Sequence, residues 1–408
     1  MIKNWFRNMG PGTLVAAAFI GPGTVTVCTL AGAHFGFTLL WAMVLSIIAT
    51  LVLQEMAARL GIISQRGLSE VIRTAISNPL LKKMVILLIL AAIVIGNAAY
   101  EAGNISGGIL GLETLTGTAT VKMGGIAVNY LSVVVGIIAF VLLYIGNYKV
   151  LERVLISLVI LMSISFLATA IITKPDLTGV LKGSLIPSFP ENSILTIIGL
   201  IGTTVVPYNL FLHASLVKEK WGSGDLSKAR QDTYISIVLG GIVSMAIIVS
   251  GAAIQSPEIA NATDLARGLT PLYGNFSKYF LGIGLFSAGI TSAITAPLAA
   301  AYVAEGCLNW KGGLRSTPFR AVWILILLTG IVFSSIGFKP IEIIKFAQVA
   351  NGLLLPVIAI ILLWIMNESH ILGSYKNTVI QNSLAVLIII VSLFLGIKSI
   401  LKVFELIG

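Results

Sequence analysis

Charged residues are scarce in this sequence, and this scarcity is the first fact that limits what the protein can be. Of the 408 residues, 10% are Asp, Glu, Lys or Arg, whereas 57% are hydrophobic, and the mean hydropathy is +1.01. Soluble domains carry about 25% charged residues, because their surfaces face water. The composition therefore excludes a soluble enzyme or binding module, and it predicts an all-α polytopic membrane protein whose helices lie in a lipid bilayer.

Cysteine and histidine are scarce as well. The two cysteines, Cys28 and Cys307, lie in apolar sequence and offer neither a disulfide framework nor a metal cluster. The three histidines, His34, His213 and His370, are far apart, and none has the spacing to Glu or His that a metalloprotease needs. We therefore expect no cofactor, no protein-bound metal and no enzymatic activity.

Apolar runs long enough to cross a bilayer recur along the chain, and we predict eleven transmembrane helices. The net charge of +10 comes from Lys and Arg residues scattered through short loops, without the basic and aromatic stripe of a nucleic-acid-binding protein. A cytoplasmic amino terminus places 17 of these 26 residues inside. The positive-inside rule then predicts a multi-pass cell-membrane protein whose carboxyl terminus is extracytoplasmic. The predicted spans are 11–33, 37–61, 83–107, 127–146, 150–172, 192–216, 232–254, 277–304, 319–337, 341–366 and 379–401.

Two of the predicted spans are interrupted by glycine and proline. The first contains IGPGT, with Gly21 and Gly23 on either side of a proline, and the sixth contains IGLIGTTVVPYNLFLH, with Gly202 and Pro207. An unwound backbone inside a membrane is tolerated only where its freed N–H and C=O groups face a ligand or a wet cavity. Broken helices at matching positions of two halves are typical of inverted-repeat transporters, whose substrate binds at the bilayer midplane.

The matching breaks also predict how the chain is organised. We expect a first five-helix repeat over residues 1–172, an extracellular loop over 173–191, a second and inverted repeat over 192–366, and an additional helix over 367–408. The connections between spans are short, so no separate soluble domain is expected.

Several segments of the sequence resemble those of a known family. The runs AAFIGPGTVTVCTLAGAHFGFTLLWAMVLSIIATLVLQEMAARLGI, GTTVVPYNLFLHASLV, APLAAAYVAEG and AQVANGLLLPVIAIILLW look like the first two, the sixth, the eighth and the tenth helices of the NRAMP divalent-metal transporters. The resemblance covers nearly the whole chain. It implies the LeuT-like fold, in which five plus five inverted helices, with helices 1 and 6 broken, are followed by an eleventh. It also implies transport by alternating access.

The sequence departs from the family pattern where that family binds metal. The resemblance places Gly21 and Thr24 at the Asp and Asn of the first-helix motif Asp-Pro-Gly-Asn. In the sixth helix, Thr203 stands at the family's Ala, Val206 at its Met and Tyr208 at its His. The carboxylate, the amide and the thioether that would repay the dehydration of a divalent cation are therefore all absent from these positions.

The third and tenth helices depart from the pattern in the same way. The resemblance aligns the Gln that the family can add to its coordination shell with Leu354, and the family's Asp-x-x-Glu pair with Ala98 and Glu101. The joint loss of the carboxylate, the amide and the thioether favours a changed substrate over a weakened metal site. The sequence therefore predicts that no residue here serves as a metal ligand.

Our main hypothesis from these features is a secondary active transporter for a small organic solute with a carboxylate, amino-acid-like in character. The half-helix that begins near Thr24 presents N–H groups with a partial positive charge, and the glycines let a ligand approach the backbone. Two alternatives stay open: a divalent metal ion transporter of the Mn²⁺ or Mg²⁺ type, with carbonyl and hydroxyl coordination, and a non-transporting sensor. The predicted substrate-binding residues are Gly21, Gly23, Thr24, Thr203, Val206, Tyr208, Asn209, Asn351 and Leu354.

Two further residues are candidates for a proton pathway that couples transport to protons. Glu101 lies deep in the third span, where a carboxylate usually faces a cavity or relays protons, although a structural, hydrogen-bonded Glu would also fit. His213 follows Tyr208 on the sixth span, and a packing histidine is its alternative explanation. We expect Glu55, near the end of the second span, to anchor nearby loops.

Overall fold

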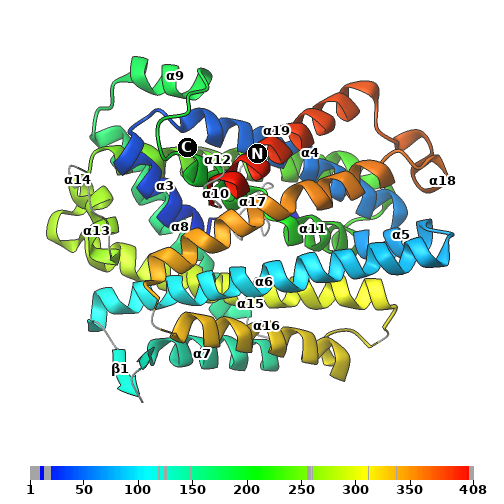
Figure 1. Cartoon of the computed structure of the whole chain (residues 1–408), viewed down its shortest axis with the longest axis horizontal. Helices are drawn as coiled ribbons and strands as arrows, with labels where there is room; N and C mark the ends of the chain where they lie inside the picture. Colours follow the sequence, from blue (N-terminus) through cyan, green and yellow to red (C-terminus); the bar gives the residue numbers. More distant parts are fainter. Residues whose placement is uncertain are drawn as a thin grey trace.

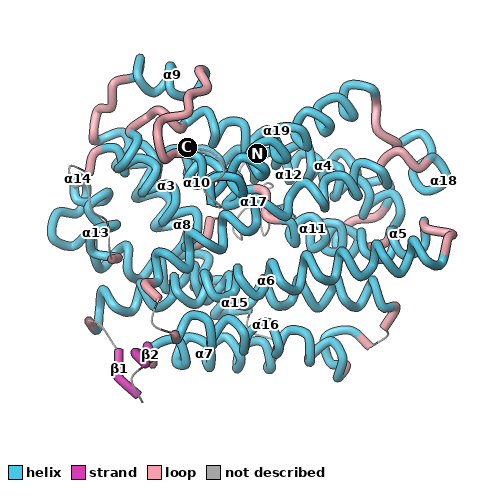
Figure 2. Tube along the Cα trace, viewed as in Figure 1, coloured by secondary structure: helices cyan, strands magenta, loops and turns pink. Residues whose placement is uncertain are grey.

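The computed structural model describes residues 10–12, 20–117, 120–123, 126–146, 149–254, 259, 261–310, 312–336 and 338–403. The chain is almost entirely helical in these ranges (Figure 2). The α-helices are α3 (Pro22–Phe35), α4 (Leu40–Ser64), α5 (Leu68–Ala75), α6 (Pro79–Thr116), α7 (Leu131–Ile145), α8 (Lys149–Ile172), α9 (Leu177–Leu185), α10 (Ile194–Thr204), α11 (Pro207–Lys220), α12 (Leu226–Ala252), α13 (Ala262–Ala266), α14 (Thr270–Tyr273), α15 (Ser277–Leu308), α16 (Thr317–Ser335), α17 (Pro340–Ile365), α18 (Ser369–Leu372) and α19 (Val379–Val403). Two strands, β1 (Thr120–Met123) and β2 (Ile126–Asn129), pair antiparallel.

The predicted all-α membrane architecture is confirmed. Each of the eleven predicted spans contains an α-helix over most of its described residues, and the sixth span consists of α10 and α11. Nine helical segments among the described residues are long and apolar enough to cross a bilayer. The helix α7 is shorter, with 15 residues, and the first span is described as a helix mainly from Pro22 onward. The count of eleven transmembrane helices therefore stays a prediction.

Two local features differ from the sequence-based expectation. The span predicted to begin at residue 127 begins as a strand, and its helix starts only at Leu131, whose N–H donates to the side chain of Asn129 over 3.0 Å. The segment 173–191, predicted as a loop, contains the short helix α9. Its amino terminus is capped by the Asp176 carboxylate, which accepts hydrogen bonds from the N–H groups of Thr178 and Gly179 at 3.0 Å.

The long helices run side by side along the length of the molecule (Figure 1). The helix α6 lies between α17 and α16, while α5 and α18 gather at one end of the molecule and α9, α13 and α14 at the other. The long helices α6 and α15 approach closely: a β-carbon built at Gly289 would lie 2.5 Å from the backbone nitrogen of Gly108. Glycine at this contact lets the two backbones meet, as small residues commonly do between membrane helices.

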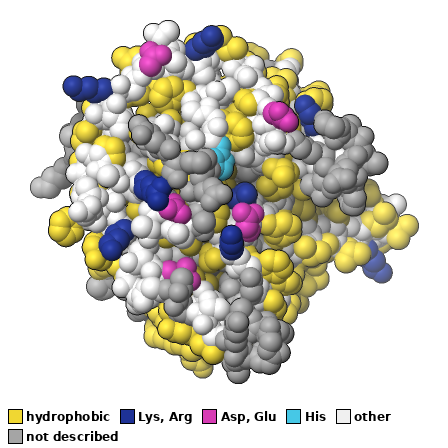
Figure 3. Space-filling model, turned by 60° about the vertical axis from the view of Figure 1, so that its left-hand side comes forward, with side chains coloured by type: hydrophobic (Ala, Val, Ile, Leu, Met, Phe, Trp, Pro, Cys, Tyr) yellow, Lys and Arg dark blue, Asp and Glu magenta, His cyan; other side chains and the backbone are white. Residues whose placement is uncertain are grey.

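Large apolar side chains cover the outside of the helix bundle. Among the exposed ones are Ile137 and Tyr144 on α7, Phe333 on α16, Phe346 on α17 and Phe394 on α19. On the face drawn in Figure 3, hydrophobic side chains form broad areas, and Lys, Arg, Asp and Glu are few and scattered. Such a surface suits the hydrocarbon of a bilayer and agrees with a multi-pass membrane protein.

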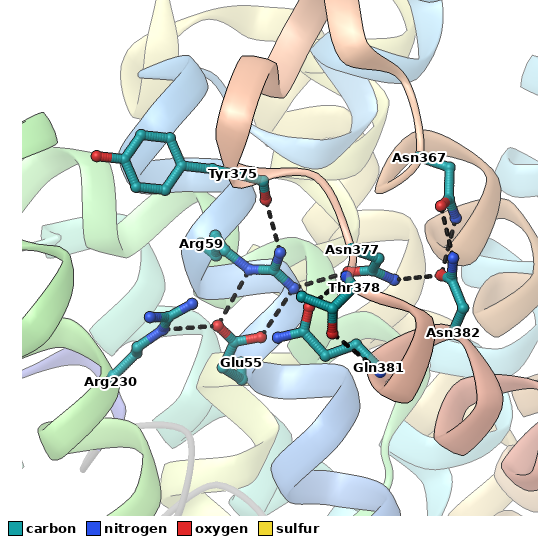
Figure 4. A network of polar contacts seen from close by, with 9 residues as sticks. All are labelled: Glu55, Arg59, Arg230, Asn367, Tyr375, Asn377, Thr378, Gln381 and Asn382. Atoms are coloured by element: carbon teal, nitrogen blue, oxygen red, sulfur yellow. Dashed lines mark hydrogen bonds and ion pairs between the residues drawn. The ribbon is translucent and has the colours of Figure 1, made fainter.

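A buried ionic network joins three parts of the chain at the carboxyl-terminal end of α4 (Figure 4). The guanidinium of Arg59 donates to both carboxylate oxygens of Glu55 at 3.0 Å, and Arg230 of α12 donates to Glu55 at 2.8 Å. Arg59 also donates to the Tyr375 carbonyl at 2.6 Å and to the Asn377 side chain at 2.7 Å. Glu55 and Arg59 are 4% and 2% exposed, so the network ties α4 to α12 and to the segment before α19.

We expect Arg59→Met to lower the free energy of unfolding by about 3–5 kcal/mol, because it leaves buried acceptors without their cation. Arg66→Met is the matched control: its ion pair with Glu70 is 3.7 Å long and solvent-exposed, and such pairs contribute about 0–1 kcal/mol. Denaturant unfolding of both variants in detergent, followed by tryptophan fluorescence, measures the difference. Equal destabilisation by the two substitutions would contradict a structural role for the network.

Candidate functional site

The first helix break lies immediately before α3. Gly21 has an extended backbone (φ −100°, ψ −173°), and the helix begins with Pro22. Proline suits this first helical position, because its missing N–H would have no helical acceptor there. The first helical hydrogen bond runs from the N–H of Val25 to the Gly21 carbonyl, over 3.2 Å. The first turn of α3, including Gly23 and Thr24, therefore faces the break with the positive end of the helix dipole.

The second break separates α10 from α11 and has a similar design. The helix α10 ends at Thr204, Val205 and Val206 are non-helical, and α11 begins with Pro207. The N–H of Asn209 bonds back to the Val206 carbonyl at 3.0 Å. The last carbonyls of α10 and the first N–H groups of α11 meet here, so the break presents both acceptors and donors.

The helix α17 lies against both breaks. A β-carbon at Gly23 would overlap the carboxamide of Gln348, and one at Gly202 would overlap the Gln348 backbone carbonyl. Gly202 requires glycine because its neighbour is the backbone of α17, whereas a side chain at Gly23 would displace the flexible carboxamide of Gln348. Farther along, a β-carbon at Gly352 would lie 2.7 Å from Ile198 of α10. The side chain of Gln348 is therefore held between the two breaks, and Asn351 lies one turn away on the same helix.

The helix α6 forms another wall of the site. A β-carbon at Gly107 would overlap the ring of Pro22, so α6 packs directly on the start of α3. Tyr100 of α6 packs edge-on against Tyr208 of α11, with ring centroids 5.5 Å apart. The Tyr100 hydroxyl also lies beside the Gln348 side chain. Five helices, α3, α6, α10, α11 and α17, thus meet at the two breaks.

Several polar atoms at this junction make no hydrogen bond to the part of the chain that the structure describes. They are the Tyr208 hydroxyl, both side-chain polar atoms of Asn209, Oε1 of Gln348 and Nδ2 of Asn351. All four residues are at most 2% exposed. Burying a polar group without a partner is costly, so natural proteins rarely do it outside a functional site. The concentration of such atoms marks this junction as the candidate substrate site.

The structure places most of the predicted binding residues around the two breaks. Gly21, Gly23 and Thr24 form the start of α3, and Val206, Tyr208 and Asn209 the start of α11. Asn351 is buried on α17, one turn after Gln348. The Thr203 hydroxyl is already used, since it donates to the Leu200 carbonyl at 2.8 Å.

Leu354 lies elsewhere. A β-carbon at Gly96 of α6 would lie 2.5 Å from Leu354, which lines an outer groove between α6 and α17. The tenth-helix residue that reaches the breaks is Gln348, which the sequence analysis missed. A signal for it was present, because Gln348 and Asn351 are three residues apart and so share one face of an otherwise apolar helix.

The two proton-pathway candidates are buried on different sides of the site. Oε2 of Glu101 accepts a hydrogen bond from Asn104 at 3.2 Å, whereas Oε1 has no partner among the described residues. Nδ1 of His213 lies 2.8 Å from Oε1 of Gln54, and Nε2 lies 3.5 Å from the Thr233 hydroxyl. His213 follows Asn209 by one turn of α11, so a polar path leads away from the second break.

The polar atoms that this site offers to a ligand are mainly oxygens of uncharged groups. No group of three or more His, Cys, Asp or Glu residues that could hold a metal ion occurs in the described ranges. A cation between the breaks would instead meet the carboxamide oxygens of Asn209 and Gln348, the Tyr208 hydroxyl and the carbonyls at the end of α10. Oxygen ligands of this kind are the ones that hard divalent cations prefer.

Curated relatives resemble the chain over nearly its whole length. A divalent metal cation transporter MntH of Verminephrobacter eiseniae is 26% identical over 383 residues, which cover 91% of this chain and 83% of the relative. The MntH transporter of Staphylococcus saprophyticus is 28% identical over 425 residues, which cover 98% and 93%.

Solved structures show the same fold. A manganese transporter of Eremococcus coleocola, in complex with an aromatic bis-isothiourea substituted compound, has a TM-score of 0.74 at 21% identity and covers 97% of this chain and 86% of its own. A nucleobase-cation-symport-1 family transporter in a closed conformation has a TM-score of 0.51 at 15% identity, with coverages of 98% and 94%. These likenesses confirm the LeuT-like fold with broken helices 1 and 6.

The relatives also correct the functional hypothesis. An organic solute was the main expectation, and it is wrong: the curated relatives carry the name of divalent metal cation transporters. The loss of the usual ligands at positions 21, 24 and 206 is therefore no evidence for another substrate class. The expectation of no enzymatic activity is confirmed, since these relatives are transporters. The family model for natural resistance-associated macrophage protein-like proteins matches residues 12–402, and the chain therefore belongs to the Nramp family.

Proposed function

We propose that the protein transports a divalent metal ion across the membrane by alternating access, with the ion bound between the two helix breaks. The observation that carries this proposal is the set of buried, unpartnered oxygens on Tyr208, Asn209 and Gln348. They lie at the broken helices of a fold whose named relatives move divalent cations. A bound cation would give each of these oxygens the partner that it lacks within the protein.

The ligand set supports a preference for hard ions. The site offers carboxamide, hydroxyl and backbone oxygens, and Val206 occupies the place where a thioether would favour softer metals. Neutral oxygens repay less dehydration energy than carboxylates do, so the ion should keep part of its water shell. Mg²⁺ gives up water reluctantly and usually keeps several water molecules when protein-bound. We therefore propose Mg²⁺ or Mn²⁺ as the substrate, ahead of Cd²⁺.

The remaining expectations from the sequence belong to the same proposal. We place the amino terminus in the cytoplasm and the carboxyl terminus outside, because Lys and Arg gather in the loops of that assignment. Residues 1–172 and 192–366 would form the two inverted repeats, joined through the outer segment 173–191 and followed by the additional helix over 367–408. Glu101 and His213 are the proposed proton carriers, since both are fully buried polar groups, on α6 and on α11.

Uptake into liposomes tests the proposed function directly. Purified protein should catalyse saturable uptake of Mn²⁺ and Mg²⁺, each competing with the other, because both ions prefer oxygen ligands. Cd²⁺ should compete weakly, since no thioether faces the breaks. Protein-free liposomes provide the background. Absence of saturable uptake for both hard ions, or tight competition by Cd²⁺, would contradict the proposal.

Gln348→Met should weaken the apparent affinity for the transported ion. Replacing the carboxamide oxygen removes one contact to a charged group, a change of about 1.5–3 kcal/mol, or about 10- to 150-fold. Leu354→Met is the matched control on the same helix, because Leu354 faces the outer groove and its affinity effect should be negligible. Equal effects of the two variants in a Mn²⁺ titration would remove Gln348 from the site.

Glu101→Gln should abolish uptake driven by a proton gradient while leaving exchange of metal across the membrane intact. A carboxamide keeps the shape of the side chain but cannot gain and release a proton. Glu113→Gln is the control: it lies on the same helix near the end of α6, where its side chain accepts a hydrogen bond from Asn129 at 3.0 Å. Gradient-driven accumulation that survives in the Glu101 variant would exclude this residue as the proton carrier.

A further inference from the structure

A large apolar groove lies on the outside of the bundle, apart from the substrate site. It encloses about 780 Å³ between α6, α16 and α17, the three neighbouring helices along one side of the molecule in Figure 1. Ligand pockets in proteins commonly measure about 300–1,000 Å³, so the groove is large enough for a bound molecule. None of the lining residues is among those placed at the helix breaks.

Small residues line one part of the groove, and aromatic residues line another. Small residues of α6, including Gly96, Ala99 and Ala102, leave the space open. Phe338 and Phe346 rise beside it and are 67% and 66% exposed, so they stand away from the protein core. Small residues and exposed rings together form a channel that fits a flexible hydrocarbon chain.

The length of the groove matches one half of a bilayer. Along α17 it extends from Glu342 to Leu354, a rise of about 18 Å at 1.5 Å per residue. One leaflet contributes about 15 Å of the hydrocarbon core, which is about 30 Å thick in all. A groove that spans one leaflet and opens on membrane-spanning helices is shaped for an acyl chain that enters from the membrane surface.

Glu342 is the one charged residue among the described residues that line the groove, and it lies at the end where α17 begins. Lys345, which is outside the lining, pairs with it at 3.3 Å. Lys339 lies exposed one residue before the helix, at the same end, and does not line the groove. A lysine at the end of a membrane helix extends its ammonium group to the interface, where lipid phosphates lie.

We propose that the groove between α6, α16 and α17 is a binding site for a membrane phospholipid. One acyl chain lies over Gly96, Ala99 and Ala102, and the phosphate lies near Lys339 and Lys345. The apolar channel selects a hydrocarbon chain, its length selects a chain of one leaflet, and the lysines near its end select an anionic or zwitterionic head group. This site is independent of the transported ion.

Photolabelling of the full chain in liposomes tests the proposal. The liposomes contain phosphatidylcholine with a small fraction of phosphatidylglycerol that carries a diazirine on one acyl chain, and labelled peptides are mapped by mass spectrometry. We expect labelling of the groove to exceed that of equally exposed side chains on α7. Ala99→Phe and Ala350→Phe fill the groove from opposite helices, and each should reduce its labelling to the level of α7.

Ile137→Phe is the control, because it adds a ring on the lipid-facing side of α7 without entering the groove. Lys339→Gln combined with Lys345→Gln should reduce labelling of the groove and leave labelling of α7 unchanged. The proposal is overturned if labelling is uniform over all lipid-facing helices, or if both groove-filling variants elute as folded protein and still label like the native chain. It is also overturned if a second copy of the protein crosslinks in the groove in place of lipid.

Discussion

The fold depends on one constraint, that backbone N–H and C=O groups inside a bilayer must be given partners by the protein or its ligand. Two membrane-spanning segments leave their helical hydrogen-bonding pattern, at Gly21 and at Val205–Val206. The surrounding helices α6 and α17 pack on these breaks so closely that a β-carbon at Gly107 would overlap the Pro22 ring and one at Gly202 the Gln348 carbonyl. The packing keeps lipid away from the exposed backbone and leaves it to face the substrate.

The same constraint explains how the proposed site, to which the described residues bring no acidic ligand, would hold a cation. The peptide dipoles at the end of α10 direct carbonyl oxygens to the break, and the carboxamides of Asn209 and Gln348 add side-chain oxygens. A site built on such groups has no net charge of its own. It can hold a partly hydrated ion, but it cannot replace the whole hydration shell of that ion. Selectivity then rests on the geometry of the oxygens more than on charge.

The sequence predicted the architecture well because hydropathy and helix-breaking residues are local signals. The spans, the breaks at Gly21–Gly23 and before Pro207, and the membrane class could all be read from single segments. The helix α9 and the β1–β2 hairpin were not predicted, since each depends on a short capping or pairing motif. Gln348 was missed for another reason: its role follows from the approach of α17 to Gly23, a contact between residues more than 300 positions apart. Motif alignment pointed to Leu354, and only the arrangement of the helices separates the two.

The contact between α10 and α17 has a mechanical consequence. A β-carbon at Gly202 would overlap backbone atoms of α17, and one at Gly352 would meet both the side chain and the carbonyl of Ile198 on α10, so the two helices are in close contact here. A helix–helix contact this close cannot lengthen gradually. While it is kept, α10 and α17 undergo the same displacement. The helices α10 and α17 then move as one rigid unit. The hinge for their motion must lie at Val205–Val206, where the chain has left its helical hydrogen bonds.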